Sequence, residues 1–128
     1  MLSEDALVRV LERAGLNAPV RFEEVTASTQ ATALKSMQVA AIVLETVVGT
    51  NGILVPPPGY LAGVRDLCDQ HGIVFIADEV MAGFGRTGEW FAFENFDVVP
   101  DLITFAKGSN SGYVPVGGVI ISDPIAAT

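Results

Sequence analysis

The chain has 128 residues, half of them hydrophobic, which suits one small domain or part of a larger one with a packed core. Its net charge of -8, from 7 basic and 15 acidic residues, argues against a nucleic-acid or anionic-membrane surface. One cysteine, no secretory signal pattern and no apolar run of membrane-spanning length lead us to expect a cytoplasmic protein that spans no membrane. The sequence predicts no metal site.

The N-terminal segment, residues 1–37, differs in charge from the rest of the chain. It carries four basic and five acidic residues, whereas residues 38–128 carry three basic and ten acidic ones. Residues 2–14 predict a short amphipathic helix, and residues 20–25 predict a strand. We therefore predict a boundary after residue 37.

Four short apolar runs follow, and each is typical of a buried strand. They span residues 40–44, 73–77, 102–106 and 118–122. Between the first two runs, residues 60–71 carry apolar side chains at helical spacing, and Gly72 closes that helix. Strand, helix and strand in this order predict an α/β fold with a mostly parallel sheet covered by helices.

Three of these runs end in ionisable side chains. Glu45 follows the first run, Asp78 and Glu79 follow the second, and Lys107 follows the third. In open α/β sheets, ligands bind outside the carboxyl ends of the strands, so these charges would share one crevice. The alternative is that polar residues simply end each strand and face the solvent.

The loops after Asp78 and Lys107 favour the crevice. Three glycines in residues 83–88 allow a close approach of the backbone, and the small polar residues 108–112 leave the lysine uncrowded. A lysine at the end of a buried strand can be partly desolvated, which lowers its pKa and suits it to attack a carbonyl. A lysine that forms a Schiff base, together with a carboxylate beside a pyridine nitrogen, is what pyridoxal phosphate requires.

Two motifs carry a resemblance to a known family. They are Phe75-Ile-Ala-Asp-Glu-Val-Met-Ala-Gly-Phe-Gly-Arg-Thr-Gly88 and Asp101-Leu-Ile-Thr-Phe-Ala-Lys-Gly-Ser-Asn-Ser-Gly112. With these motifs, residues 39–128, about 70% of the chain, closely resemble class III aminotransferases of fold type I. The resemblance implies that residues 38–128 are a partial pyridoxal-phosphate-binding large domain, built on part of its mostly parallel sheet.

The resemblance also implies roles for four residues. Lys107 would form the Schiff base with pyridoxal phosphate and move the proton, and Asp78 would pair with the pyridine nitrogen. Val80 would pack against the ring, and Glu45 would give polar support. The implied reaction transfers an amino group from an amine or ω-amino acid to a 2-oxo acid such as pyruvate, and full-length relatives would be homodimers.

Other positions indicate which substrate group of the family this chain resembles. Arg86 and Trp90 lie in a loop that approaches substrate in relatives, although Trp90 could instead belong to a packed cluster with Phe91 and Phe93. Thr50 stands where some relatives that use 2-oxoglutarate have a glutamate, and Met81 stands where many have a glutamine. This combination resembles the pyruvate-dependent ω-amino acid group, which includes taurine–pyruvate aminotransferases.

An alternative to an active enzyme stays open. We find no match in this chain to the family's phosphate-gripping Ser-Gly segment or to its substrate-carboxylate arginine. The chain could therefore be a truncated or fused, non-catalytic fragment that binds pyridoxal phosphate only weakly. Residues 20–33 resemble the opening of biotin–protein ligase catalytic domains over a short stretch, with an ordinary strand and helix as the alternative.

Overall fold

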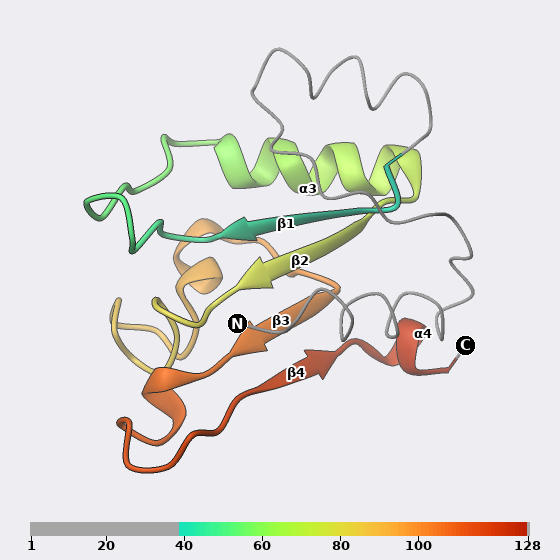
Figure 1. Ribbon diagram of the computed structural model, residues 1–128. Helices are drawn as coiled ribbons and strands as arrows, with labels where there is room; N and C mark the ends of the chain where they lie inside the picture. The colour runs from blue at the N-terminus through green and yellow to red at the C-terminus, as the bar shows by residue number, and fades with distance from the viewer. Residues whose placement is uncertain (1–38, 128) are drawn as a thin grey trace.

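A computed structural model describes residues 39–127 (Figure 1). The helix expected over residues 2–14, the strand expected over 20–25 and the biotin-ligase-like stretch lie outside the described residues. The boundary after residue 37 therefore stays a prediction.

The described residues build one four-stranded sheet. Its strands are β1 (Ala41–Glu45), β2 (Val74–Asp78), β3 (Leu102–Phe105) and β4 (Gly118–Ile121), in that spatial order. The first three strands are parallel, and β4 pairs with β3 in the antiparallel direction. The predicted mostly parallel sheet is confirmed, and each strand lies within a residue of its expected run.

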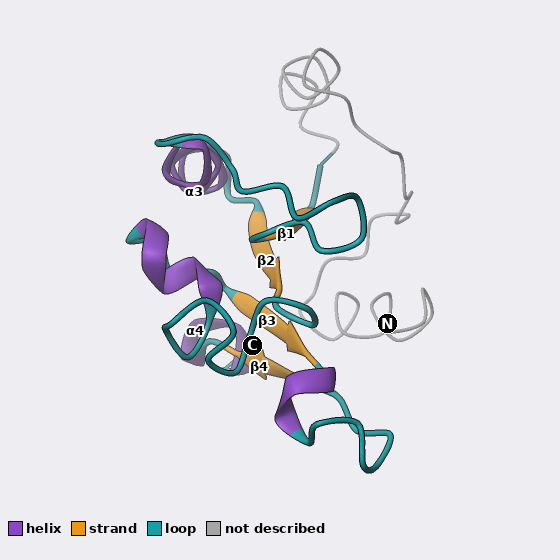
Figure 2. Cartoon of the chain, turned by 90° about the vertical axis from the view of Figure 1, so that its left-hand side faces the viewer, coloured by secondary structure: helices purple, strands orange, loops and turns teal. Residues whose placement is uncertain are grey.

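The helix α3 (Tyr60–His71) connects β1 to β2 along one face of the sheet (Figures 1 and 2). It ends where predicted, because Gly72 adopts a left-handed conformation at φ 64° and its N–H donates to the carbonyl of Cys68. Two 3₁₀ helices, η1 (Ala92–Phe96) and η2 (Lys107–Ser109), precede and follow β3, and α4 (Asp123–Ala126) follows β4. None of the helices between residues 39 and 127 is long and apolar enough to cross a membrane.

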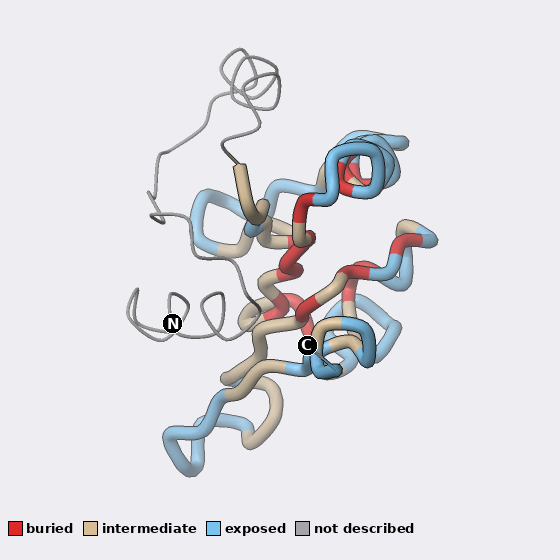
Figure 3. Tube along the Cα trace, turned by 90° about the vertical axis from the view of Figure 1, so that its right-hand side faces the viewer, coloured by how far each residue is buried: buried red, intermediate tan, exposed pale blue. Residues whose placement is uncertain are grey.

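The core lies between α3 and the central strand β2. Leu61, Val64 and Cys68 of α3 pack with Phe75 and Ala77, which point to the same face of β2 because side chains alternate along a strand. Figure 3 shows the buried positions concentrated along this central region. Burying a large apolar side chain contributes about 1.5–3 kcal/mol, so this cluster is a main source of the fold's stability.

Burial on both faces of every strand was expected, and it is wrong for β1 and β4. Val43 of β1 is 45% exposed, and Ile120 and Ile121 of β4 are 44% and 41% exposed. Both strands lie at the ends of the described sheet, where one neighbour is lacking. Of the four strands only β2 is mostly buried, whereas β3, which also has a strand on each side, buries only Leu102 fully.

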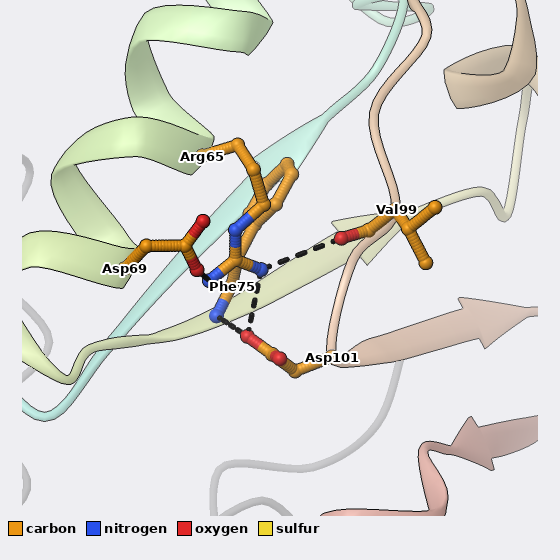
Figure 4. Close-up of polar contacts among 5 residues, drawn as sticks. All are labelled: Arg65, Asp69, Phe75, Val99 and Asp101. Atoms are coloured by element: carbon orange, nitrogen blue, oxygen red, sulfur yellow. Dashed lines mark hydrogen bonds and ion pairs between the residues drawn. The ribbon is translucent and has the colours of Figure 1, made fainter.

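A charged cluster ties α3 to the amino ends of the strands (Figure 4). The Asp101 carboxylate accepts hydrogen bonds from Arg65 Nη1 at 2.9 Å and from the Phe75 N–H at 2.8 Å. Arg65 also pairs with Asp69 at 2.7 Å and lies over the Phe75 ring, 5.6 Å from its centroid. Burial lowers the pKa of Arg65, but the hydrogen bond to Asp101 and the two nearby carboxylates outweigh it, so the pKa lies above its ordinary value.

Replacing Asp101 should therefore cost more stability than replacing Asp69. Asp101→Ala leaves the Phe75 N–H without its acceptor and takes one of two carboxylate partners from the half-buried Arg65, so we expect the free energy of unfolding to fall by about 2 kcal/mol. Asp69→Ala removes a surface pair and should cost less than about 0.5 kcal/mol. Urea denaturation followed by circular dichroism measures both, and equal losses would contradict this interpretation.

Burial raises the pKa of the Cys68 thiol, which gives a pH prediction. Above the ordinary thiol pKa, the unfolded chain loses this proton while the folded chain keeps it. The free energy of unfolding should then fall with rising pH, since the unfolded state binds fewer protons. The fall in alkaline solution should be less steep in Cys68→Ala than in the wild type. If the free energy of unfolding fell with pH equally in the two proteins, the raised pKa of Cys68 would be contradicted.

Candidate functional site

The carboxyl ends of the three parallel strands meet at one edge of the sheet. Glu45 at the end of β1 pairs in register with Asp78 at the end of β2. Asp78 pairs in turn with Thr104 of β3, and Lys107 follows three residues later. The polar strand ends predicted from the sequence thus lie along a single edge.

The two carboxylates at this edge hold the loops that follow them. Asp78 Oδ1 accepts a hydrogen bond from the Val80 N–H at 3.0 Å, and Glu45 Oε2 accepts one from the Gly49 N–H at 2.8 Å. The other oxygen of Asp78, Oδ2, makes no hydrogen bond within residues 39–127. Asp78 therefore keeps an acceptor that a ligand could use.

Lys107 lies at a sharp turn at the start of η2. Its backbone has φ 40°, a left-handed conformation that a non-glycine residue adopts only at a cost. The next residue, Gly108, packs so closely that a Cβ there would lie 3.0 Å from Phe84 Cβ and 3.1 Å from the Gly83 carbonyl oxygen. The turn is thereby pressed against the loop that follows β2.

The Lys107 side chain is exposed, and its Nζ lies 3.1 Å from the thioether sulfur of Met81. Thioether sulfur is a weak acceptor, and no carboxylate of the described chain forms an ion pair with this amine. The partial desolvation expected for Lys107 is wrong here, because the turn leaves its side chain open to solvent. The amine is instead unpaired and accessible.

A pocket of about 570 Å³ lies beside Lys107. Its lining residues come from the loop after β2 and the turn after β3: Phe84, Gly85, Arg86, Lys107, Gly108, Ser111 and Gly112. Two of these side chains are cationic and none is acidic, which suits an anionic small molecule. Asp78 and Val80 do not line this pocket, and Glu45 lines a separate one of about 270 Å³ beside Tyr60.

Aromatic side chains hold the loop between β2 and η1. The Phe91 ring stacks on Phe93 with centroids 5.7 Å apart, and Phe84 meets the edges of Phe91 and Phe105 at 5.5 and 5.6 Å. The alternative of a packed cluster is thus confirmed for Phe91 and Phe93. It is wrong for Trp90, which is 72% exposed.

The crevice position expected for Glu79 is wrong, because its side chain is fully buried, and sequence reasoning missed Thr46, which is buried beside it. The Thr46 hydroxyl donates a hydrogen bond to Glu79 Oε1. A signal was available, because successive residues of an extended chain point to opposite sides and Asp78 and Glu79 cannot share one environment. Nothing local indicated which of the two points inward.

The comparison with protein families matches the family described as Aminotransferase class-III over residues 9–128. The chain is 49% identical over 87 residues to an acetylornithine aminotransferase from Methanopyrus kandleri, which covers 68% of this chain and 22% of that protein. It is 48% identical over 87 residues to a putrescine–pyruvate aminotransferase from Pseudomonas aeruginosa, with 68% and 19% covered.

A solved structure has the same fold. Taurine:2-oxoglutarate aminotransferase from Bifidobacterium kashiwanohense, in complex with pyridoxal phosphate and glutamate, matches 96% of this chain and 24% of its own at 49% identity, with a TM-score of 0.72. The chain spans about a fifth to a quarter of the length of these relatives. With the family match over nearly its whole length, the chain belongs to the class III aminotransferases.

Proposed function

We propose that this chain supplies the lysine- and aspartate-bearing part of a pyridoxal-phosphate-dependent aminotransferase site. The observation that carries the proposal is Lys107, an accessible amine without an acidic partner in the described chain, at the same sheet edge as Asp78. The reaction would move an amino group from an amine or ω-amino acid to a 2-oxo acid.

The residues present fit pyridoxal phosphate in three respects. Lys107 Nζ has only a weak thioether neighbour, so it is available to bond to an aldehyde. Asp78 has a carboxylate oxygen without a hydrogen bond in the described part of the chain, and this oxygen would accept one from the pyridine nitrogen. The pocket beside Lys107 includes Arg86, whose charge suits the anionic groups of the cofactor or the substrate.

Pyridoxal phosphate supplies an aldehyde and a ring that accepts electrons from the bond broken at the substrate carbon. Lys107 would act first as the nucleophile and then carry a proton at Nζ. Asp78 would keep the ring nitrogen protonated, and Val80, half-buried beside it, would pack on the ring. Glu45 would act indirectly by holding the loop that begins at Gly49.

For the acceptor we propose a 2-oxo acid, with pyruvate favoured. Thr50 lacks a carboxylate, and the Pseudomonas relative is named for pyruvate. The Bifidobacterium relative is named for 2-oxoglutarate, so the two acceptors are the pair to compare. A homodimer is proposed for the full-length protein, by analogy with the family.

Lysine labelling tests the role of Lys107. The chain has two lysines, Lys35 and Lys107, so Lys35 serves as an internal control. After incubation with pyridoxal phosphate and reduction with borohydride, mass spectrometry of peptides should find the pyridoxyl group on Lys107. Before reduction, the Schiff base with pyridoxal phosphate gives a visible absorption band. Lys107→Ala should lose this band, whereas Lys35→Ala should keep it. A band that persists in Lys107→Ala would contradict the assignment.

A second candidate function is binding of pyridoxal phosphate without turnover. The exposure of Lys107 favours it, because an open site gives little of the water exclusion that amino transfer needs. Assays with an ω-amino acid donor and either pyruvate or 2-oxoglutarate separate the two candidates. Amino transfer by the unreduced chain, supplied with pyridoxal phosphate, would exclude a binding-only role.

Packing around Met81 gives a further prediction. A Cβ on Gly49 would lie 3.0 Å from both Cβ and Cγ of Met81, the residue that contacts Lys107. Gly49→Ala should lower the free energy of unfolding by about 1 kcal/mol through overpacking. Adding Met81→Ala removes the contact with Cγ but keeps Cβ, so it should relieve part of that penalty, and the two effects should not add.

Gly63→Ala is the matched control, because a Cβ on this helical glycine meets nothing within 4 Å. Alanine favours helix, so this variant should be neutral or slightly more stable than the wild type. Urea denaturation of the wild type, the three single variants and the double variant completes the comparison. Additive effects of Gly49→Ala and Met81→Ala would show that the two residues do not press on each other.

A further inference from the structure

Glu79 directly follows Asp78, and its side chain is fully buried. Its Oε1 accepts hydrogen bonds from the Thr46 hydroxyl and from the Phe93 N–H at 3.0 Å, and its Oε2 accepts one from the Ala92 N–H at 2.9 Å. All three partners are donors, so both carboxyl oxygens are used as acceptors. The side chain thus joins the end of β1 to the start of η1.

The backbone of Glu79 is held as firmly as its side chain. Its N–H donates to the Thr104 carbonyl of β3 at 2.9 Å, and its carbonyl accepts from the Gly83 N–H at 2.9 Å. A Cβ on Gly83 would lie 2.8 Å from the same carbonyl oxygen, so the chain passes Glu79 as closely as glycine allows. One residue therefore binds both the beginning and the end of the loop formed by residues 80–91.

This loop, which we call the 80–91 loop, forms one side of the candidate site. Met81 of the loop contacts Lys107 Nζ, and Phe84 and Arg86 line the pocket with Lys107. Within the loop, the Trp90 carbonyl accepts hydrogen bonds from the N–H groups of Phe84, at 2.6 Å, and Gly85, at 3.3 Å. The loop is thereby closed on itself, and Glu79 sets where it lies relative to β3.

We propose that Glu79 is the positioning residue of this site, a buried carboxylate that fixes the 80–91 loop against Lys107 and Asp78. The inference rests on the proposed role of Lys107 and Asp78 in binding pyridoxal phosphate. Glu79 itself is buried and would touch neither the cofactor nor the substrate. It acts through the loop that it holds.

The 128-residue chain contains its own probe for this test. Trp90 is its only tryptophan and lies in the 80–91 loop, so Trp90 fluorescence anisotropy reports the motion of that loop. The second readout is the binding of pyridoxal phosphate, as an apparent Kd and as the wavelength of the visible band. Both are measured where circular dichroism shows that each variant is folded.

Glu79→Gln keeps the size of the side chain but turns one acceptor into a donor that faces other donors. We expect Trp90 anisotropy to fall, the apparent Kd for pyridoxal phosphate to rise about tenfold and the visible band to shift. Glu89→Gln removes the same charge from an exposed position of the same loop. It should leave the Kd within about twofold of the wild type.

Thr46→Val keeps the shape of the threonine and removes one donor to Glu79, so it tests the proposal even if Glu79→Gln does not fold. Its anisotropy and Kd should change in the same direction as in Glu79→Gln, by a smaller amount. A folded Glu79→Gln that is less stable but keeps wild-type anisotropy, Kd and band position would overturn the proposal. If only Thr46→Val folds, wild-type values in that variant would overturn it.

The outcomes also separate this inference from the function on which it rests. If the wild-type chain takes up no pyridoxal phosphate at Lys107, the proposed function fails. Trp90 anisotropy, measured without any cofactor, then still decides whether Glu79 fixes the loop. A fall in Glu79→Gln would support the fixing of the loop, and an unchanged value would contradict it.

Discussion

The parallel pairing of β1, β2 and β3 is the constraint on which the rest of the structure depends. It brings Glu45, Asp78 and Thr104 into one row, although long segments of chain separate them. Lys107 reaches the same edge only because β3 lies beside β2 in this register. A shift of one residue between these strands would turn Asp78 inward and Glu79 outward, which would remove the acceptor from the site and expose the carboxylate that holds its loop.

The sequence predicted the strands, the helix α3 and the edge at which the polar residues gather, because apolar runs and their polar ends are local signals. It did not reveal that β4 is antiparallel, since a short apolar run carries no sign of its direction. It also did not reveal the burial of Glu79, whose partners Ala92 and Phe93 come from beyond a loop. The sequence also did not predict the exposure of Lys107. Its backbone is left-handed at φ 40°, and a lysine gives no local signal for that conformation.

The candidate site combines residues with different kinds of support. The family assignment rests on the match over residues 9–128. The proposed roles of Lys107 and Asp78 rest on an accessible amine and on a carboxylate oxygen that makes no hydrogen bond within residues 39–127. Arg86 adds a second cation beside Lys107. These features favour an anionic ligand at the sheet edge, and the hydrogen bonds of Glu79 hold the loop that forms one wall of that site.

The cluster of Arg65, Asp101 and the Phe75 N–H lies at the amino ends of the strands, opposite the candidate site (Figure 4). The two ends of the sheet therefore differ, because α3 is anchored at the amino end and the candidate site lies at the carboxyl end. Loops at the carboxyl ends can then diversify without loosening the anchor of the helix. Substitutions at loop positions such as Thr50, Met81 and Arg86 should therefore leave the amino-end cluster intact.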